Sequence, residues 1–416
     1  MIASAFDPGL PEADSAYHAV RLAGDGRLYF TLCTHRIDTH ARIGCFDPAT
    51  ARVESVTDVG EALGDDARGV LPQGKIHVSP TEAAGRLYMA TMLGYYADDR
   101  RGRGRYPGFH VLSLELATGE LSSLARGPAD EGLITATLDP SRLVYHGLTY
   151  PSGLFCRYDV RADRLMTSPR PVADPPLPAM IHGRPLYPIC RSLGLDDEGA
   201  VYGSGRDGAI WRAEPGGEPR LMSNVSVRDG IVPPLDATGR RDSFWRVVVW
   251  HPEERCFYGI HAGTRSLFRF DPRAALLEPL ARLGPGRGHA TFGSQLGLVA
   301  AGRTLHHIAH GPPVRVPGRP TPRTSAYLVS YDLDRGTVTE HGPLRTETGD
   351  RVLFAESLAA GPMGDLYTVA WVEVSDAELW PRYRQLRAEA CNGECAGETY
   401  RMLLLRIPAA RAEDAA

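Results

Sequence analysis

The stretch GRLYFTLCTH (residues 26–35) decides the fold, because similar stretches recur at regular intervals along the chain. Each copy places an aromatic or apolar segment directly after a short turn. The other copies are GRLYMATMLG (85–94), SRLVYHGLTY (141–150), GAVYGSGRDG (199–208), RCFYGIHAGT (255–264), RTLHHIAHGP (303–312) and GDLYTVAWVE (364–373). Seven copies spaced by about 50 to 60 residues indicate a repeat architecture.

Each repeat carries one apolar segment before the quoted stretch and another after it, which ends in a polar turn such as DPAT (47–50). Short strands separated by Gly, Asp and Pro turns are typical of all-β proteins. Four strands in each of seven repeats predict a seven-bladed β-propeller. We expect residues 1–416 to form a single propeller domain, with blades that start near residues 17, 75, 134, 191, 246, 295 and 355.

The last repeat lacks an outermost strand. Its third strand, TYRMLLLRIP (399–408), is followed by only a few residues. We therefore expect the N-terminal segment, about residues 2–8, to supply the missing strand and close the ring. Such pairing removes the open sheet edges that would otherwise remain.

The long insertions fall in two kinds of connection. If the strands of a blade are named A to D from the axis outward, A–B and C–D turns are short, whereas the long segments are all B–C or D–A connections. These are residues 95–108, 169–188, 224–244, 311–325 and 374–398. B–C and D–A connections share one face of a propeller, so we expect a functional face there. The insertion at 374–398 predicts a helix that begins near the capping box Ser375–Glu378 and acts as a lid.

The amino-acid composition excludes some classes of binding partner. The chain of 416 residues has 46 basic and 50 acidic residues, so it lacks the basic excess of a general nucleic-acid binder. We expect no transmembrane helix, no membrane partner and no secretion signal, and hence a cytoplasmic protein. Seven cysteines, an odd number, fit reduced thiols. The role of Cys391 and Cys395 stays open between a metal, a disulfide and chance, and the oligomeric state is also open.

A polar ring is expected where the innermost strands enter from the loop-rich face. Eleven residues before the aromatic position of each repeat, the residue type is mostly polar, although the third and fifth repeats need a shift of one or two positions. The set is His18, His77, Thr135, Arg191, Arg246, Gln295 and Glu356. Seven polar groups at one depth predict a ligand or metal site.

Imidazole nitrogen combined with Gln or Glu oxygen suits Mn, Fe or Zn. The candidate metal ligands are His18, His77, Gln295, His310 and Glu356. The alternative is that each histidine is an ordinary polar residue with satisfied hydrogen bonds. We expect no nucleotide cofactor, because the glycine–arginine run at 101–105 lacks the strand–helix context of a dinucleotide loop.

The ends of the B strands point to the same face and supply candidate catalytic and substrate-binding groups. His146 or His261 would act as general base, with Tyr150 nearby, while Arg191 and Arg246 would clamp a carboxylate. The candidate substrate-binding residues are Lys75, Tyr96, Arg206, His35 and Trp371. Arginines concentrated in the long loops also favour an anionic ligand, although an arginine bias would produce solvated loop charges as well.

Lys75 is the only lysine of the chain, and the other 45 of the 46 basic residues are arginine. As a base it would need burial to lower its pKa. The alternative interpretation is a solvated lysine at the edge of the face.

The segments HGLTYPSGLFCRYD (146–159) and YGSGRDGAIWR (202–212) resemble bacterial seven-bladed propeller proteins placed near the oligogalacturonate lyases and virginiamycin-B-lyase-like proteins. The resemblance spans nearly the whole chain as architecture. In oligogalacturonate lyases a divalent metal held by several His and a Gln lies on the axis and β-elimination follows. None of that family's ligands maps residue by residue onto this chain.

These observations predict a metal-assisted lyase or isomerase that acts on a small anionic, carboxylate-bearing molecule at the loop-rich face. One alternative is a non-catalytic propeller that binds a ligand or a protein. A further alternative is a metal-free biosynthetic cyclase or lactonase, whose activity would survive chelation.

Overall fold

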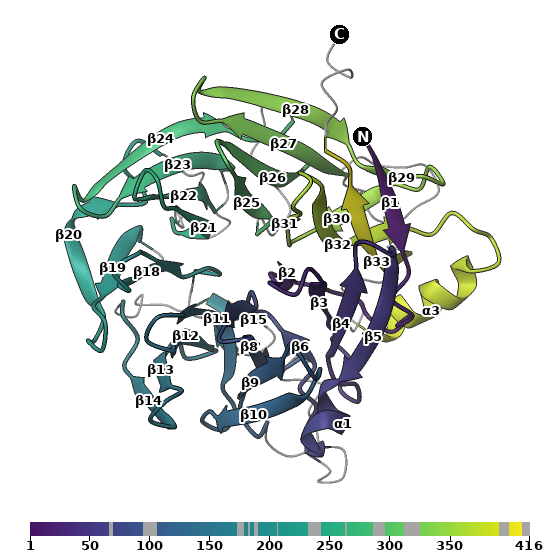
Figure 1. The fold of residues 1–416 in the computed structure, drawn as a ribbon, viewed down its shortest axis with the longest axis horizontal. Helices are drawn as coiled ribbons and strands as arrows, with labels where there is room; N and C mark the ends of the chain where they lie inside the picture. Colours follow the sequence, from purple (N-terminus) through teal and green to yellow (C-terminus); the bar gives the residue numbers. More distant parts are fainter. Residues whose placement is uncertain are drawn as a thin grey trace.

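A computed structural model describes residues 1–65, 70–94, 106–172, 179–181, 184–186, 190–205, 207–231, 243–262, 264–285, 296–311, 325–390 and 399–409. Seven sheets stand in a ring around a central axis, and the chain runs outward from the axis through the strands of each sheet (Figure 1). The chain is a seven-bladed β-propeller, which confirms the predicted fold class.

The first four blades follow the order of the chain. Blade one contains β2 (Val20–Leu22), β3 (Leu28–Leu32), β4 (Arg42–Asp47) and β5 (Arg52–Asp58), followed by helix α1 (Val59–Leu63). Blade two contains β6 (Lys75–Ile76), β7 (Thr81–Ala83), β8 (Arg86–Met92), β9 (His110–Glu115) and β10 (Leu121–Arg126). Blade three contains β11 (Gly132–Asp139), β12 (Val144–Tyr150), β13 (Phe155–Asp159) and β14 (Arg164–Ser168). A hairpin, β15 (Ala179–Ile181) and β16 (Arg184–Leu186), precedes blade four, which contains β17 (Gly194–Leu195), β18 (Val201–Ser204), β19 (Ala209–Ala213) and β20 (Arg220–Ser226).

The other three blades complete the ring. Blade five contains β21 (Trp245–His251), β22 (Cys256–His261), β23 (Ser266–Asp271) and β24 (Leu276–Arg282). Blade six contains β25 (Leu298–Ala301), β26 (Thr304–His310), β27 (Ala326–Asp332) and β28 (Thr337–Pro343). Blade seven contains β30 (Val352–Ala355), β31 (Ala359–Ala360), β32 (Leu366–Glu373), β33 (Tyr400–Ile407), β1 (Ile2–Phe6) and the short β29 (Arg345–Thr346).

The recurring aromatic residue of the sequence has a structural reason. Tyr29 donates a 2.8 Å hydrogen bond to Asp25 in the turn between β2 and β3, and Tyr202 donates a 3.0 Å bond to Asp196 in the equivalent turn of blade four. The rings themselves are buried between neighbouring blades. Each such tyrosine therefore contributes apolar area to the core while its hydroxyl fixes the turn at the opposite end from the long loops.

The N-terminal strand closes the ring, as predicted. β1 pairs antiparallel with β33, with Ser4 opposite Arg406, and its other edge pairs parallel with β29, with Ile2 opposite Arg345. Blade seven is thus built from both ends of the described chain, and the two ends lie close together (Figure 1).

The predicted helix in the blade-seven insertion exists, but the lid interpretation is wrong. α3 (Trp380–Ala390) lies at the outer edge of the ring, away from the axis (Figure 1). Asp376 caps the preceding turn by accepting a 2.8 Å bond from the Glu378 amide. Arg387 anchors the helix, because its buried guanidinium donates to the carbonyls of Pro11 and Ala13 and lies over the Tyr400 ring. These bonds hold the helix against the N-terminal segment and blade seven, not over the axis.

Replacing Arg387 by methionine is expected to lower the free energy of unfolding by about 2 kcal/mol, because two buried carbonyls lose their donor. Urea unfolding of both proteins measures the change. Arg384→Met is the matched control in the same helix, since Arg384 is exposed and contacts only the Trp380 ring among the described residues. Equal losses in both variants would contradict the anchoring role.

The strand bounds place every long connection where the sequence predicted. The segments after β8, β14, β20, β26 and β32 are all B–C or D–A connections, so they leave the ring on one face. Most of their residues, including Tyr96, Cys391 and Cys395, lie outside the described residues, as does Arg206 between β18 and β19. Within the described part of the chain, no helix is both long and apolar enough to cross a membrane.

Candidate functional site

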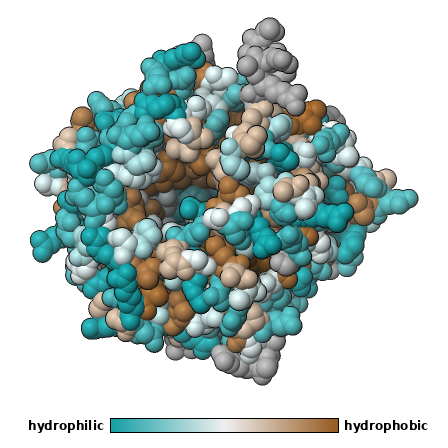
Figure 2. Space-filling view, viewed as in Figure 1, coloured by the Kyte–Doolittle hydropathy of each residue, from teal (hydrophilic) through white to brown (hydrophobic). Residues whose placement is uncertain are grey.

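The ends of the innermost strands converge at the loop-rich face. Lys75 starts β6, Arg246 is the second residue of β21, and Arg191 lies three residues before β17. His18 and Glu356 come from blades one and seven. Space-filling atoms leave the molecule hollowed at its centre, with both polar and apolar residues on the walls (Figure 2). We use the name axial site for the group made by Asp14, Tyr17, His18, His35, Lys75, His77, Arg191, Arg246 and Glu356.

A hydrogen-bonded chain runs through Lys75, His35 and Asp14. The Nζ of Lys75 lies 2.7 Å from Nε2 of His35, and Nδ1 of the same ring lies 2.8 Å from Oδ1 of Asp14. The backbone amide of His35 also donates to Asp14 at 2.8 Å. Burial raises the pKa of Asp14, but the interactions with His35 outweigh burial and hold that pKa below its usual value. Asp14 is therefore an acceptor, so Nδ1 of His35 carries the hydrogen and Nε2 accepts from Lys75.

Lys75 is only 7% exposed, so the interpretation as a solvated lysine is wrong. Burial lowers its pKa to about 8, and the charge of Arg191 acts in the same direction, against the carboxylates of Asp14 and Glu356. The Tyr17 ring lies 5.1 Å from Nζ and stacks on the His77 ring with centroids 4.2 Å apart. An amine with this pKa exchanges its proton near neutral pH, which no arginine can do.

Arginines from blades four and five add positive charge to the axial site. Burial lowers the pKa of Arg246 to about 10, and Arg191 contributes to that shift. Nη1 of Arg191 is buried and has no hydrogen-bond partner among the described residues. Lys75 interacts with the carboxylates of Asp14 and Glu356, and Arg191 and Arg246 both interact with Glu356. Asp14 is already bonded to His35. The described part of the site therefore has an excess of positive charge and an unused guanidinium donor.

The two axial histidines are neutral. Burial lowers the pKa of His18 to about 4, and its Nε2 lies 2.9 Å from the carbonyl of Leu296 in blade six. The pKa of His77 lies well below its usual value because of burial and the charges of Arg191, Lys75 and Arg246. Its Nδ1 is buried without a hydrogen-bond partner in the described structure. His77 thus offers a neutral polar group toward a ligand.

The predicted site residues fall into three groups. The structure brings His18, His77, Arg191, Arg246, Glu356, Lys75 and His35 together, and it places Tyr150 within electrostatic reach of Arg191. Gln295, Tyr96 and Arg206 lie outside the described residues. The third group, His146, His261, His310 and Trp371, has other contacts.

His146 lies within β12 and stacks on Phe155, with ring centroids 5.9 Å apart. Both ring nitrogens of His261 are engaged, by the hydroxyls of Ser243 at 2.8 Å and Thr264 at 3.1 Å. His310 accepts a bond from the Ala355 amide and stacks on Phe354. Trp371 stacks on Tyr400 and Phe354. The roles assigned to these four residues from sequence stay predictions.

The metal hypothesis also stays a prediction. No three His, Cys, Asp or Glu side chains within the described ranges are arranged to hold an ion, and Gln295 belongs to the part of the chain that is not described. Nε2 of His18 is hydrogen-bonded to the carbonyl oxygen of Leu296, so Nδ1 is the candidate metal-ligand atom of this histidine.

Sequence reasoning missed Asp14 and Tyr17. Both lie between β1 and β2, and neither occupies the position eleven residues before the aromatic residue from which the polar ring was predicted. The available signal was the aligned position of His35 at the end of the first B strand, since an ordered histidine commonly needs a carboxylate or carbonyl to orient its ring.

The comparisons place the fold among solved propellers. The chain matches the extracellular domain of a protein described as a one-component system from B. thetaiotaomicron with a TM-score of 0.52 and 12% identity, over 97% of this chain and 40% of that one. It matches the WD40 repeats of RRP9 with a TM-score of 0.52 and 8% identity, over 94% of each chain. The periplasmic gluconolactonase of Pseudomonas aeruginosa matches with a TM-score of 0.50 and 14% identity, over 78% of this chain and 84% of that one.

These likenesses establish the propeller fold. The chain spans about two fifths of the length of the B. thetaiotaomicron protein that it matches. No protein-family model matches the chain, and comparison with curated protein sequences gives no match. Propellers at this level of similarity include an enzyme and repeat proteins alike, so the fold by itself does not indicate the chemistry of this chain.

Buried neutral histidines outside the axial site make stability depend on pH. Burial lowers the pKa of His146, His261 and His307 to about 4 each. In the unfolded chain these groups bind protons near pH 6.5, so between pH 6.5 and 4 the unfolded state holds more protons and stability falls as pH falls. We expect a loss of about 1 to 2 kcal/mol for each histidine between pH 7 and pH 5. Urea unfolding at the two pH values measures it, and an unchanged midpoint would contradict the burial of neutral imidazoles.

Proposed function

We propose that the protein is an enzyme that moves a proton at a carbon atom next to a carboxylate, as in a lyase or isomerase reaction on a small anionic substrate. The single observation that carries this proposal is the position of Lys75. The only lysine of the chain is buried and bonded to a histidine–aspartate pair beside two arginines. A solvated surface lysine would need none of these partners.

The charges of the side chains at the axial site indicate a role for each of them in this reaction. Arg191 and Arg246 bind the substrate carboxylate, for which the unpartnered Nη1 of Arg191 is a ready donor. The neutral amine of Lys75 then removes a proton from the adjacent carbon, and the two guanidinium groups stabilise the negative charge that develops. His35 accepts a hydrogen bond from Lys75 and is held by Asp14, so both act as positioning residues.

The proposal needs no metal, but it is compatible with one. If Mn, Fe or Zn is bound, His18, His77, Glu356 and the undescribed Gln295 are the groups to hold it, and the ion would supply further stabilisation of the enolate. Metal analysis of the purified protein, with activity measured before and after chelation, separates the two cases.

The cytoplasmic location expected from the sequence stays a prediction.

The function is tested by proton exchange, which needs no knowledge of the natural substrate. Pyruvate, 2-oxoglutarate, D-gluconate and D-galacturonate are incubated with the protein in D₂O at pH 8, and NMR follows the loss of the proton signals next to the carboxyl or keto group. Calorimetry measures binding in parallel. Enzyme-dependent exchange of at least one compound supports the proposal. Binding of a carboxylate without exchange of any compound would instead indicate the non-catalytic ligand-binding propeller.

A further inference from the structure

The lysine at the axial site is chemically different from the groups that usually act as general bases. General bases in enzymes are most often histidines or carboxylates, and this chain has 14 His and 50 acidic residues. Lys75 is also the one position where arginine does not supply the cation. A primary amine adds one chemical ability that none of those groups has, which is the formation of an imine with a carbonyl carbon.

We propose that Lys75 forms a covalent imine with a 2-oxo acid, whose carboxylate is held by Arg191 and Arg246. This inference rests on the proposed function and specifies its substrate class. Lys75 then activates the substrate as an imine instead of removing a proton itself. The proton that moves lies on the carbon next to the imine carbon, because the carbonyl carbon of a 2-oxo acid carries no hydrogen. In a 2-oxo acid the electrophilic carbon is directly bonded to the carboxylate. Cations that hold the carboxylate beside Nζ therefore bring the carbonyl carbon to the amine as well.

The groups around Nζ suit each proton transfer of the step. The neutral amine attacks the carbonyl carbon, a C–N bond forms, and the carbonyl oxygen takes up a proton to give a carbinolamine. The nitrogen loses one proton in forming the neutral carbinolamine, the hydroxyl group is protonated and leaves as water, and the nitrogen then loses its second proton to give the imine. The sum is amine plus 2-oxo acid to imine plus water, with no oxidant or reductant. His35, 2.7 Å from Nζ, is the group that accepts and returns these protons.

The surroundings also hold the amine in place. Lys75 is only 7% exposed, and its Nζ lies 2.7 Å from Nε2 of His35. The Tyr17 ring, 5.1 Å from Nζ, covers the amine on one side. This lysine is therefore oriented and shielded from bulk water, unlike a lysine on the surface.

Reductive trapping tests the inference directly. Pyruvate is added with sodium cyanoborohydride, which reduces an imine to a stable secondary amine, and peptide mapping by mass spectrometry locates the adduct. The chain offers an internal reference, because its only other primary amine is the N-terminal one of Met1. We expect labelling at Lys75 about 100-fold faster than at Met1, because the site supplies an oriented carboxylate clamp. Acetone, a carbonyl compound without a carboxylate, should show no such preference.

Two variants complete the test. Lys75→Arg should lose the internal adduct and keep the one at Met1, and Arg191→Gln should reduce labelling of Lys75 about tenfold or more. Labelling of Lys75 no faster than that of Met1 in the wild-type chain would overturn the imine. If proton exchange still occurs in that case, the proposed function stands without covalent catalysis, whereas loss of both exchange and carboxylate binding would overturn the function itself.

Discussion

Replacing Lys75 by arginine is expected to reduce proton exchange by about 10³-fold, within the range that a positioned acid–base group contributes. Arginine keeps the positive charge at the axial site, but its guanidinium does not release a proton in a protein. The affinity for the carboxylate should therefore stay within a few-fold of that of the wild type. NMR exchange rates and calorimetric dissociation constants, measured on the same preparations, separate these two effects.

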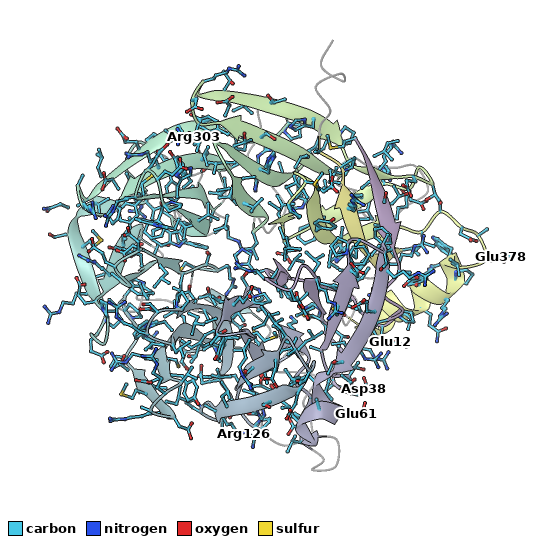
Figure 3. All side chains as sticks on the ribbon, viewed as in Figure 1. Glu12, Asp38, Glu61, Arg126, Arg303 and Glu378 are labelled. Carbon is cyan, nitrogen blue, oxygen red and sulfur yellow. The ribbon has the colours of Figure 1, made fainter. Side chains whose placement is uncertain are left out.

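Arg335→Gln is the control for the Lys75 variant, because the Arg335 side chain is 80% exposed in an outer turn and pairs only with Asp332 within the described chain. Its exchange rate should equal that of the wild type. Other charged residues such as Arg126 and Glu378 also lie at the periphery of the ring (Figure 3). Exchange that survives in Lys75→Arg would remove Lys75 from the reaction and return the role of base to His146 or His261.

Replacing Arg191 and Arg246 together by glutamine is expected to weaken carboxylate binding by about 10² to 10⁴-fold. Each charge-assisted hydrogen bond contributes about 1.5 to 3 kcal/mol, and a tenfold change in affinity corresponds to about 1.4 kcal/mol.

The single variant Arg191→Gln should also change the dependence of the exchange rate on pH. Arg191 lowers the pKa of Lys75, so its removal should move that pKa upward. Because the base acts when it is unprotonated, the rising limb of the pH–rate profile should move to higher pH.

Calorimetry with the compound that shows exchange measures the affinity, and exchange rates between pH 6 and pH 10 give the profile. Glutamine preserves most of the side-chain volume, and circular dichroism verifies that the sheets remain intact. Unchanged affinity in the double variant would mean that the carboxylate is bound elsewhere on the face. A profile that moves to lower pH would contradict the electrostatic coupling between Arg191 and Lys75.

The fold was accessible from the sequence because its signal is repeated. Seven copies of a turn followed by an aromatic strand fix the number of blades even when single copies are weak, as RTLHHIAHGP (303–312) is. The missing outer strand of the last repeat then predicted the role of β1, which pairs with β33. The same periodicity located His18, His77, Arg191, Arg246 and Glu356, since equivalent positions of a symmetric ring must meet at the axis.

Features outside the repeat could not be predicted in the same way. Asp14 lies before the first repeat and Tyr17 at its first position, so the repeat pattern did not place them beside His35 and Lys75. The burial of Lys75 depends on side chains from several blades, which no local pattern encodes. The direction of α3 was also not predictable from its helix propensity, because it follows from the bonds of Arg387 to the distant carbonyls of Pro11 and Ala13.

Ring closure by β1 has a consequence for synthesis of the chain. Ser4 leaves the ribosome about 400 residues before its partner Arg406. At about 5 to 20 residues per second, β1 waits about 20 to 80 seconds for its partner strand. During that time blades one to six can form in order, while β1 remains an unpaired edge that could pair with another nascent chain. Cells that make this protein therefore have reason to shield β1 until the last blade emerges.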